Sequence, residues 1–267
     1  MLTTETVDAL ADRLEAAEAG RTPMRHFTID HPDMTVQDGY AVQARWMEKK
    51  REQGAVVRGH KIGLTSKVMQ EGAGIPEPDY GVLLDYMFYD AGSVIPMDKY
   101  IAPRVEVELC FQMGKALSGP NCTIFDVLNA TEYVIPALEI IDTRFHRFDP
   151  DTNAPRKIMD TVADNAANGA VVVGGRPIRP MDLDLRWVSA LLLCNETVIE
   201  SGVAAAVLNH PANGIAWLAN KLWQHGENLE AGEILLAGSF TRSVPVSAGE
   251  VYHCDYGPLG SISCRFA

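Results

Sequence analysis

The sequence predicts an α+β protein in which a helical N-terminal part precedes a larger, strand-rich part. Apolar residues recur at helical spacing in two stretches before Gly54, whereas short apolar runs typical of strands dominate from Val82 onward. These strands do not alternate regularly with long helices, which argues against a doubly wound sheet and against a (β/α)₈ barrel. A chain of 267 residues can form one large domain or two smaller ones. We expect a division into residues 1–80 and 81–267.

Two helices are expected in the N-terminal part. The threonine pair at residues 3–4 can cap the first helix, which ends at Gly20. The second helix is expected to begin near Thr35 and to run to Gly54, with Asp38 completing a short-armed form of the capping box.

The rest of the chain is expected to be mainly β. A strand within residues 55–64 precedes a short helix over residues 67–71 and an irregular connection rich in Gly and Pro. A short helix follows Thr123, and a longer one follows His210 with a proline in its first turn. The segment from Arg144 to Thr161 is polar and aperiodic, which is typical of a loop over a site. Further strands are predicted at Val94–Pro96, Val105–Gln112, Ala137–Asp142, Ala170–Val173, Ala190–Cys194, Ile234–Ala237, Val251–Tyr256 and Ser261–Phe266.

Composition excludes several classes of function. The chain has 23 Lys and Arg against 35 Asp and Glu, and its formal net charge of −12 repels phosphate backbones and anionic membrane surfaces. We therefore expect no nucleic acid and no membrane as partners, and no apolar run reaches the roughly 18 residues that span a bilayer. An acidic N-terminus and five scattered cysteines without a CxxC pair favour a cytoplasmic protein with reduced thiols. The sequence also lacks P-loop, dinucleotide-binding and GxSxG motifs.

The segment PRVEVELCF at residues 103–111 places two carboxylates on one face of a strand. Because strand side chains alternate, Glu106 and Glu108 share the face opposite Val105 and Val107. Two carboxylates roughly 7 Å apart along a strand repel each other unless a cation lies between them. They form either a solvated acidic face or a pair of oxygen ligands for Mg²⁺ or Mn²⁺.

A third carboxylate favours the metal-binding interpretation. Glu139 lies in the apolar stretch VIPALEIID, and a buried carboxylate needs a partner. A divalent cation shared with Glu106 and Glu108 would satisfy all three acids, whereas the alternative is an ion pair of Glu139 with Arg104 or Arg144. Three acids without a suitable His favour a hard cation over zinc.

Further candidate site residues each have a structural alternative. Lys61 lies within an apolar strand and is either a solvent-facing residue or a carboxylate anchor and proton-transfer group. Thr65 and Ser66 can supply hydroxyls and N–H groups to an anion at a helix start. Asp79 on its own is an ordinary turn residue. Ser239 follows a strand at a glycine that permits close approach of a ligand to the backbone, although an ordinary strand-end turn has the same pattern.

Taken together, these segments resemble the fumarylacetoacetate hydrolase superfamily, and within it the hydratase/decarboxylase branch that acts on 2-hydroxydienoates of meta-cleavage pathways. The motifs that carry the resemblance are RGHKIGLTSK, EPDYG, PRVEVELCF, PALEIID, DNAANGAVVVGG and AGSFTRSV. The resemblance extends over nearly the whole chain. It implies a mixed β-roll core with a helical N-terminal region, and homo-oligomers that are commonly decamers. It also implies Mg²⁺ or Mn²⁺ bound by Glu106, Glu108 and Glu139, with catalytic roles for Lys61 and Asp79.

The activity that the resemblance implies is metal-dependent addition of water to a seven-carbon 2-oxo-alkenedioate in aromatic catabolism. A hydratase of a five-carbon 2-hydroxydienoate and a 2-oxo-3-enedioate decarboxylase are alternatives that use the same site. The alternative outside the enzymes is a protein without catalytic activity that assembles with a catalytic partner. The seven-carbon substrate carries a distal carboxylate, for which Arg242 is the leading candidate cation, with Arg144 and Lys157 as competitors.

Overall fold

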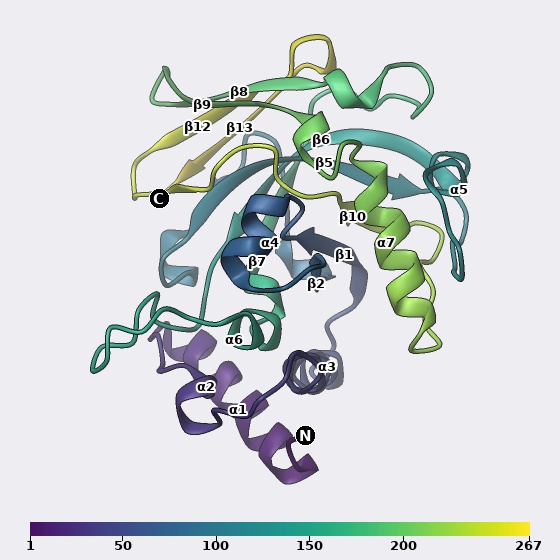
Figure 1. Ribbon diagram of the computed structural model, residues 1–267. Helices are drawn as coiled ribbons and strands as arrows, with labels where there is room; N and C mark the ends of the chain where they lie inside the picture. Colours follow the sequence, from purple (N-terminus) through teal and green to yellow (C-terminus); the bar gives the residue numbers. More distant parts are fainter.

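The computed structural model describes residues 1–267 and shows two β-sheets with an N-terminal layer of helices (Figure 1). Most strand pairs of the larger sheet are antiparallel, but two are parallel, so the sheet is mixed. The expected α+β class with a mixed sheet and N-terminal helices is confirmed. The larger sheet has eight strands in the order β2 (Asp79–Leu84), β1 (Val57–Gly63), β10 (Ile234–Leu236), β5 (Arg104–Met113), β6 (Thr131–Ile141), β7 (Asn168–Val173) and β3 (Phe88–Asp90), with β11 (Val244–Pro245) paired to β5.

The second sheet packs against the first and encloses the main apolar core. Its five strands are β4 (Val94–Ile95), β13 (Ser261–Phe266), β12 (Val251–Asp255), β8 (Ser189–Cys194) and β9 (Thr197–Val203). The largest buried cluster joins Val107 of β5, Leu192 of β8, Ile262 of β13 and Leu218 of α7 (Ala212–Trp223). Burial of this apolar surface is the main stabilising contribution. Because one face of β5 enters this core, its alternate side chains must lie on the other face.

The N-terminal helices form a layer with a core of its own. They are α1 (Thr4–Gly20), α2 (Phe27–Asp30) and α3 (Val36–Glu52). Leu14 of α1 and Trp46 of α3 are buried in the same apolar cluster. The predicted capping box is confirmed, since the Thr35 hydroxyl accepts the Asp38 N–H and the Asp38 carboxylate accepts the Thr35 N–H. None of the helices has the length and apolar character needed to cross a membrane.

The first two strands belong to the large sheet rather than to the helical layer. The boundary expected at residue 80 falls within β2, which lies beside β1 at one end of that sheet. A short helix, α4 (Lys67–Ala73), connects these two strands, and α5 (Ile124–Ala130) connects β5 to β6. Strands β2, β3, β9 and β11 were not predicted, because each is very short or includes polar and glycine residues and is completed by pairing with another strand.

The polar segment from Arg144 to Thr161 is packed rather than free. The Arg144 guanidinium donates to the buried Asp164 carboxylate, and Arg25 of the N-terminal part donates to the Asp149 carboxylate at 2.8 Å. The segment ends in a helix that was not predicted, α6 (Ile158–Ala163). Residues 144–157 are irregular, as expected, but these ion pairs tie the segment to the rest of the protein.

Candidate metal centre and active site

The predicted acidic triad meets on one face of the large sheet. Glu106 on β5 lies opposite Glu139 on β6 in the strand register, and Glu108 lies two residues farther along the same face. One carboxylate oxygen from each residue lies within 4.8 Å of the other two. Glu108 and Glu139 are buried, and Glu106 is partly exposed. The alternation of β5 therefore places the acids together, as expected.

Neither arginine considered as an ion-pair partner of Glu139 contacts it. Arg104 donates to the hydroxyl and carbonyl oxygens of Ser243, at 2.9 and 2.6 Å. Arg144 pairs with Asp164. The cation beside Glu139 is Lys61, whose Nζ lies 3.1 Å from Glu139 Oε1.

The chemistry of the triad fits a hard divalent cation. Both carboxylate oxygens of Glu139 are buried without a hydrogen-bond partner, and three carboxylates face one ammonium group. Burying an uncompensated carboxylate costs several kcal/mol. Oxygen ligands without His or Cys suit Mg²⁺, Mn²⁺ or Ca²⁺ rather than zinc. A divalent cation held by Glu106, Glu108 and Glu139 would neutralise the excess charge and satisfy the unpartnered oxygens.

Burial and mutual repulsion raise the pKa values of two triad acids. Burial raises the pKa of Glu106 to about 7, and the Glu139 charge acts in the same direction while Lys61 opposes it. Burial also raises the pKa of Glu108 well above its usual range, with further contributions from Glu139 and Glu106. Since a cation favours the ionised carboxylates, protons and metal compete for this site.

Lys61 points from β1 into the same buried cluster. Its side chain is almost fully buried, so it is not a solvent-facing strand residue. The ammonium donates to the Ala166 carbonyl oxygen at 2.9 Å. Burial alone would lower the pKa of Lys61, but the charges of Glu139 and Asp79 raise it above its usual value. Lys61 is therefore a buried, charged ammonium group beside the triad.

Asp79 is the first residue of β2 and lies opposite Gly63 of β1. The sequence placed it in an irregular connection, but β2 begins there because β1 provides the pairing partner. The carboxylate is buried, and its Oδ1 has no hydrogen-bond partner. Burial raises the pKa of Asp79, whereas Lys61 opposes the shift. A Cβ added at Gly63 would lie 2.3 Å from Asp79 Oδ1, so the glycine allows Asp79 to approach β1 closely.

A left-handed turn supports Lys61, and sequence reasoning missed it. Asn165, Ala166 and Ala167 have φ values of 52°, 51° and 57°. The left-handed conformation costs an L-residue about 1–2 kcal/mol. The Asn165 amide holds the turn by bonding both the N–H and the carbonyl of Val82, at 2.7 and 2.9 Å. The one available signal is the asparagine, since alanine gives no indication of a positive φ.

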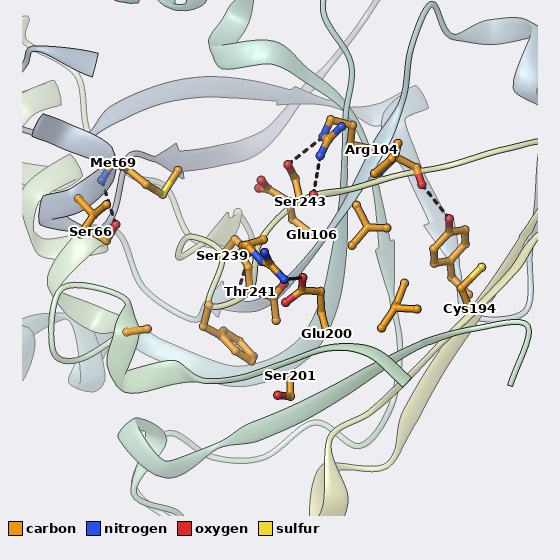
Figure 2. A pocket seen from close by; sticks show the side chains of 18 of the residues that line it. Ser66, Met69, Arg104, Glu106, Cys194, Glu200, Ser201, Ser239, Thr241 and Ser243 are labelled. Carbon is orange, nitrogen blue, oxygen red and sulfur yellow. Dashed lines mark hydrogen bonds and ion pairs between the residues drawn. The ribbon is translucent and has the colours of Figure 1, made fainter. Parts of the chain in front are cut away.

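A cavity of about 1000 Å³ opens beside Glu106 (Figure 2). Ser66, Ser239 and Arg242 line this cavity together with Glu106, so these three candidates share one space with the triad. The Ser66 hydroxyl caps α4, and the Ser239 hydroxyl donates to the Thr241 carbonyl at 3.0 Å.

Thr65 is buried behind the cavity wall, against Gly238. Gly238 has a φ of 115°, and an added Cβ would lie 2.4 Å from Thr65 Oγ1, so only glycine fits there. The Gly238 N–H donates to Glu108 Oε2 at 2.8 Å and thereby orients one acid of the triad.

The arginines and lysine proposed for a distal carboxylate differ in their surroundings. Arg242 is 86% exposed and pairs with Glu200, with Nη2 2.6 Å from Oε1. The Arg144 guanidinium is buried and engaged by Asp164. Lys157 is exposed just before α6. Each arginine already has an acidic partner within the protein.

Known proteins resemble the chain over its full length, although no family model matches it. It is 58% identical over 266 residues to the 2-oxo-hept-4-ene-1,7-dioate hydratase of Escherichia coli, with 100% of both chains covered. It is 40% identical over 265 residues to the 4-oxalocrotonate decarboxylase of Pseudomonas sp. (strain CF600), with 99% of this chain and 98% of that chain covered.

A solved structure agrees with both the fold and these relatives. The 4-oxalocrotonate decarboxylase from Pseudomonas putida G7, complexed with magnesium and adipate, superimposes with a TM-score of 0.95 at 37% identity. The match covers 100% of this chain and 99% of that chain. Full-length similarity at this level, together with the shared fold, shows that the chain belongs to the hydratase/decarboxylase branch of the fumarylacetoacetate hydrolase superfamily.

Proposed function

We propose that this protein is a hydro-lyase that adds water to 2-oxo-hept-4-ene-1,7-dioate and yields 4-hydroxy-2-oxoheptanedioate. The observation that carries the proposal is the 58% full-length identity to a hydratase of that substrate, against 40% to a decarboxylase. The buried triad with Lys61 and Asp79 beside it supports the same reaction class. Hydration is redox-neutral, so the reaction needs neither nicotinamide nor flavin.

The proposed cofactor is Mg²⁺, or Mn²⁺ in its place, held by Glu106, Glu108 and Glu139. The oxygen-only donor set and the unpartnered oxygens of Glu139 support a hard cation. The presence of magnesium in the solved decarboxylase supports Mg²⁺ in particular. When bound, the cation supplies Lewis acidity toward the 2-oxo acid end of the substrate.

Lys61 and Asp79 are the proposed proton-transfer residues. The substrate double bond moves from C4–C5 to C3–C4 when a proton leaves C3 and another is added at C5. Water then adds across C3–C4, with the hydroxyl at C4 and hydrogen at C3. The buried, charged ammonium group of Lys61 beside the triad supports its proposed part in proton transfer. Asp79 has an unpartnered oxygen, which suits an acceptor that takes a proton from water.

Four further residues are proposed to form the substrate site, three by contact and Thr65 by supporting the cavity wall. Ser66 and Ser239 line the cavity beside Glu106, Thr65 supports its wall, and Arg242 lies at its exposed rim. The homo-oligomer implied by the family resemblance, commonly a decamer, stays a prediction that sedimentation velocity tests.

The decisive experiment follows the ultraviolet absorbance of the conjugated dienoate with Mg²⁺ and identifies the product by mass spectrometry. We expect the seven-carbon dioate to gain the mass of one water. Loss of carbon dioxide from an enedioate would identify a decarboxylase, and preference for 2-hydroxypenta-2,4-dienoate would identify the five-carbon hydratase. Stoichiometric metal binding without turnover of any dienoate would identify a non-catalytic partner.

A further inference from the structure

We propose that Arg104, Arg147 and Arg156 form an anion subsite that holds the distal carboxylate of the substrate. The three guanidinium-bearing residues line a second cavity of about 690 Å³. Arg104 and Ser243 line both this cavity and the one beside Glu106, so the two spaces adjoin. The identity of the anion rests on the proposed function, whereas the cationic cavity itself is a property of the fold.

Arg104 connects the subsite to the metal centre. It lies two residues before Glu106 on β5, so both side chains are on the same face, with Cα atoms roughly 7 Å apart. A seven-carbon dioate has a comparable length between its two carboxylates. Arg104 bonds only the neutral oxygens of Ser243 and makes no ion pair with a carboxylate. Since a guanidinium stays charged in proteins, this charge is available to a ligand.

Arg147 and Arg156 line the same cavity from the polar segment that follows β6. The Arg156 N–H donates to the Arg147 carbonyl at 3.4 Å, which places the two residues side by side. Arg147 lies over the Phe148 ring, with 5.8 Å between guanidinium carbon and ring centroid, and it has no acidic partner. Arg156 donates to the Thr143 hydroxyl and lies 3.9 Å from a carboxylate oxygen of Asp164.

The charge balance of this cavity favours an anion. Asp142 is the one acid among the lining residues, and its two oxygens accept the N–H groups of Ile101 and Ala102 at 2.9 and 2.8 Å. Asp164 offsets part of the Arg156 charge, but Arg104 and Arg147 have no carboxylate partner and leave a positive field in a protein whose net charge is −12. Arg242 in the first cavity is by contrast exposed and neutralised by Glu200. Bidentate guanidinium contacts are the usual means of holding a carboxylate.

The test is a calorimetric titration of the Mg²⁺-loaded protein with two ligands of equal chain length. Both 2-oxoheptanedioate and 2-oxoheptanoate carry the 2-oxo acid end, but only the first has a distal carboxylate, and neither can be hydrated. We expect wild type to bind the dioate about 10–100-fold more tightly. Arg104→Gln and Arg147→Gln should each reduce this ratio at least threefold, with 2-oxoheptanoate affinity within about twofold of wild type. Arg265→Gln, which removes an exposed arginine of β13, should leave both affinities unchanged.

Several outcomes would overturn the inference. If both ligands lose affinity equally in the variants, the arginines support the metal centre and not the distal carboxylate. If Arg242→Gln abolishes the preference and Arg147→Gln does not, Arg242 is the anchor. If wild type binds both ligands equally, the subsite fails while the metal site stands. If it binds neither, the proposed function fails as well. Should Arg104→Gln not fold, Arg147→Gln decides alone, because Arg147 is exposed.

Discussion

Replacement of Glu106 by glutamine should stabilise the metal-free protein at pH 8. Three carboxylates face one ammonium group at the triad, and the charges of Lys61 and Arg104 offset their repulsion only in part in the absence of metal. Glutamine has nearly the shape of glutamate but no charge, so Glu106→Gln removes one repelling charge and keeps the packing. A substitution at a functional site then raises the free energy of unfolding.

The magnitude follows from the pKa of Glu106, which rises from its ordinary 4.5 to about 7 in the folded protein. A carboxyl group whose pKa is higher in the folded than in the unfolded state contributes fully to the free energy of unfolding at pH values below its unfolded pKa. This contribution is lost as the pH rises through the folded-state pKa. Metal-free wild type should therefore lose stability relative to the variant between pH 4.5 and about 7. This shift corresponds to about 3 kcal/mol, and partial exposure of Glu106 to solvent reduces the expected difference to about 1–3 kcal/mol.

The assay is urea unfolding in EDTA at pH 5 and pH 8, at one protein concentration. We expect the two proteins to be similar at pH 5 and the variant to be more stable at pH 8. Mg²⁺ should reverse this order, because binding to the folded state alone adds about 2.7 kcal/mol at 100 times the dissociation constant. Glu132→Gln, on β6 but outside the triad, is the matched control and should show neither effect. If Glu106→Gln is less stable than wild type in EDTA at pH 8, the inferred repulsion is absent.

Three further predictions concern the same site. Lys61→Met should lower kcat on the seven-carbon dioate by about 10²–10⁴-fold, with Mg²⁺ affinity by calorimetry not reduced; unchanged kinetics would remove Lys61 from the mechanism. Gly63→Ala should displace Asp79, since the new Cβ would lie 2.3 Å from Oδ1, and should lower kcat at least tenfold; Gly72→Ala, with open space around the added Cβ, should not. Mg²⁺ affinity should rise with pH through about 7, by up to about tenfold per unit for each displaced proton, and a flat profile between pH 6 and pH 8 would contradict the raised pKa of Glu106.

The sequence pattern predicted those parts of the fold that interactions between neighbouring residues determine. The alternation of Val105 and Val107 with Glu106 and Glu108 follows from burial of one strand face, and the observed β5 has that arrangement. The capping box at Thr35 is likewise a property of adjacent residues. Strand β11 is two residues long and depends on β5, which is far along the chain, whereas β2 depends on pairing with the preceding strand β1.

The candidate site likewise combines residues that local pattern predicts with an arrangement that depends on tertiary structure. Three acids in strand-like segments predicted a metal centre, but the register that brings Glu106 opposite Glu139 is a tertiary property. In the left-handed turn that bonds Lys61, Asn165 is the one residue whose type favours a positive φ, and Ala166 and Ala167 give no such signal. The conformation of this turn is imposed by the contact of Asn165 with Val82, on a strand that pattern did not predict.

Ion pairs with carboxylates also distinguish the arginines that stabilise the fold from those that are available to a ligand. The Arg144 guanidinium is buried and bonded to Asp164, and that of Arg25 is bonded to Asp149, so these charges stabilise the structure and are not free. Arg242 is the leading candidate from the sequence because a guanidinium can hold a carboxylate with two hydrogen bonds, but Glu200, which is distant in the sequence, forms an ion pair with it. Arg104 was considered only as a partner of Glu139, yet it faces a cavity without a carboxylate partner. A sequence shows how many cations a chain has, whereas the fold decides which of them lack an acid. The unpaired cations beside a buried acidic site are therefore the ones that can select an anionic substrate.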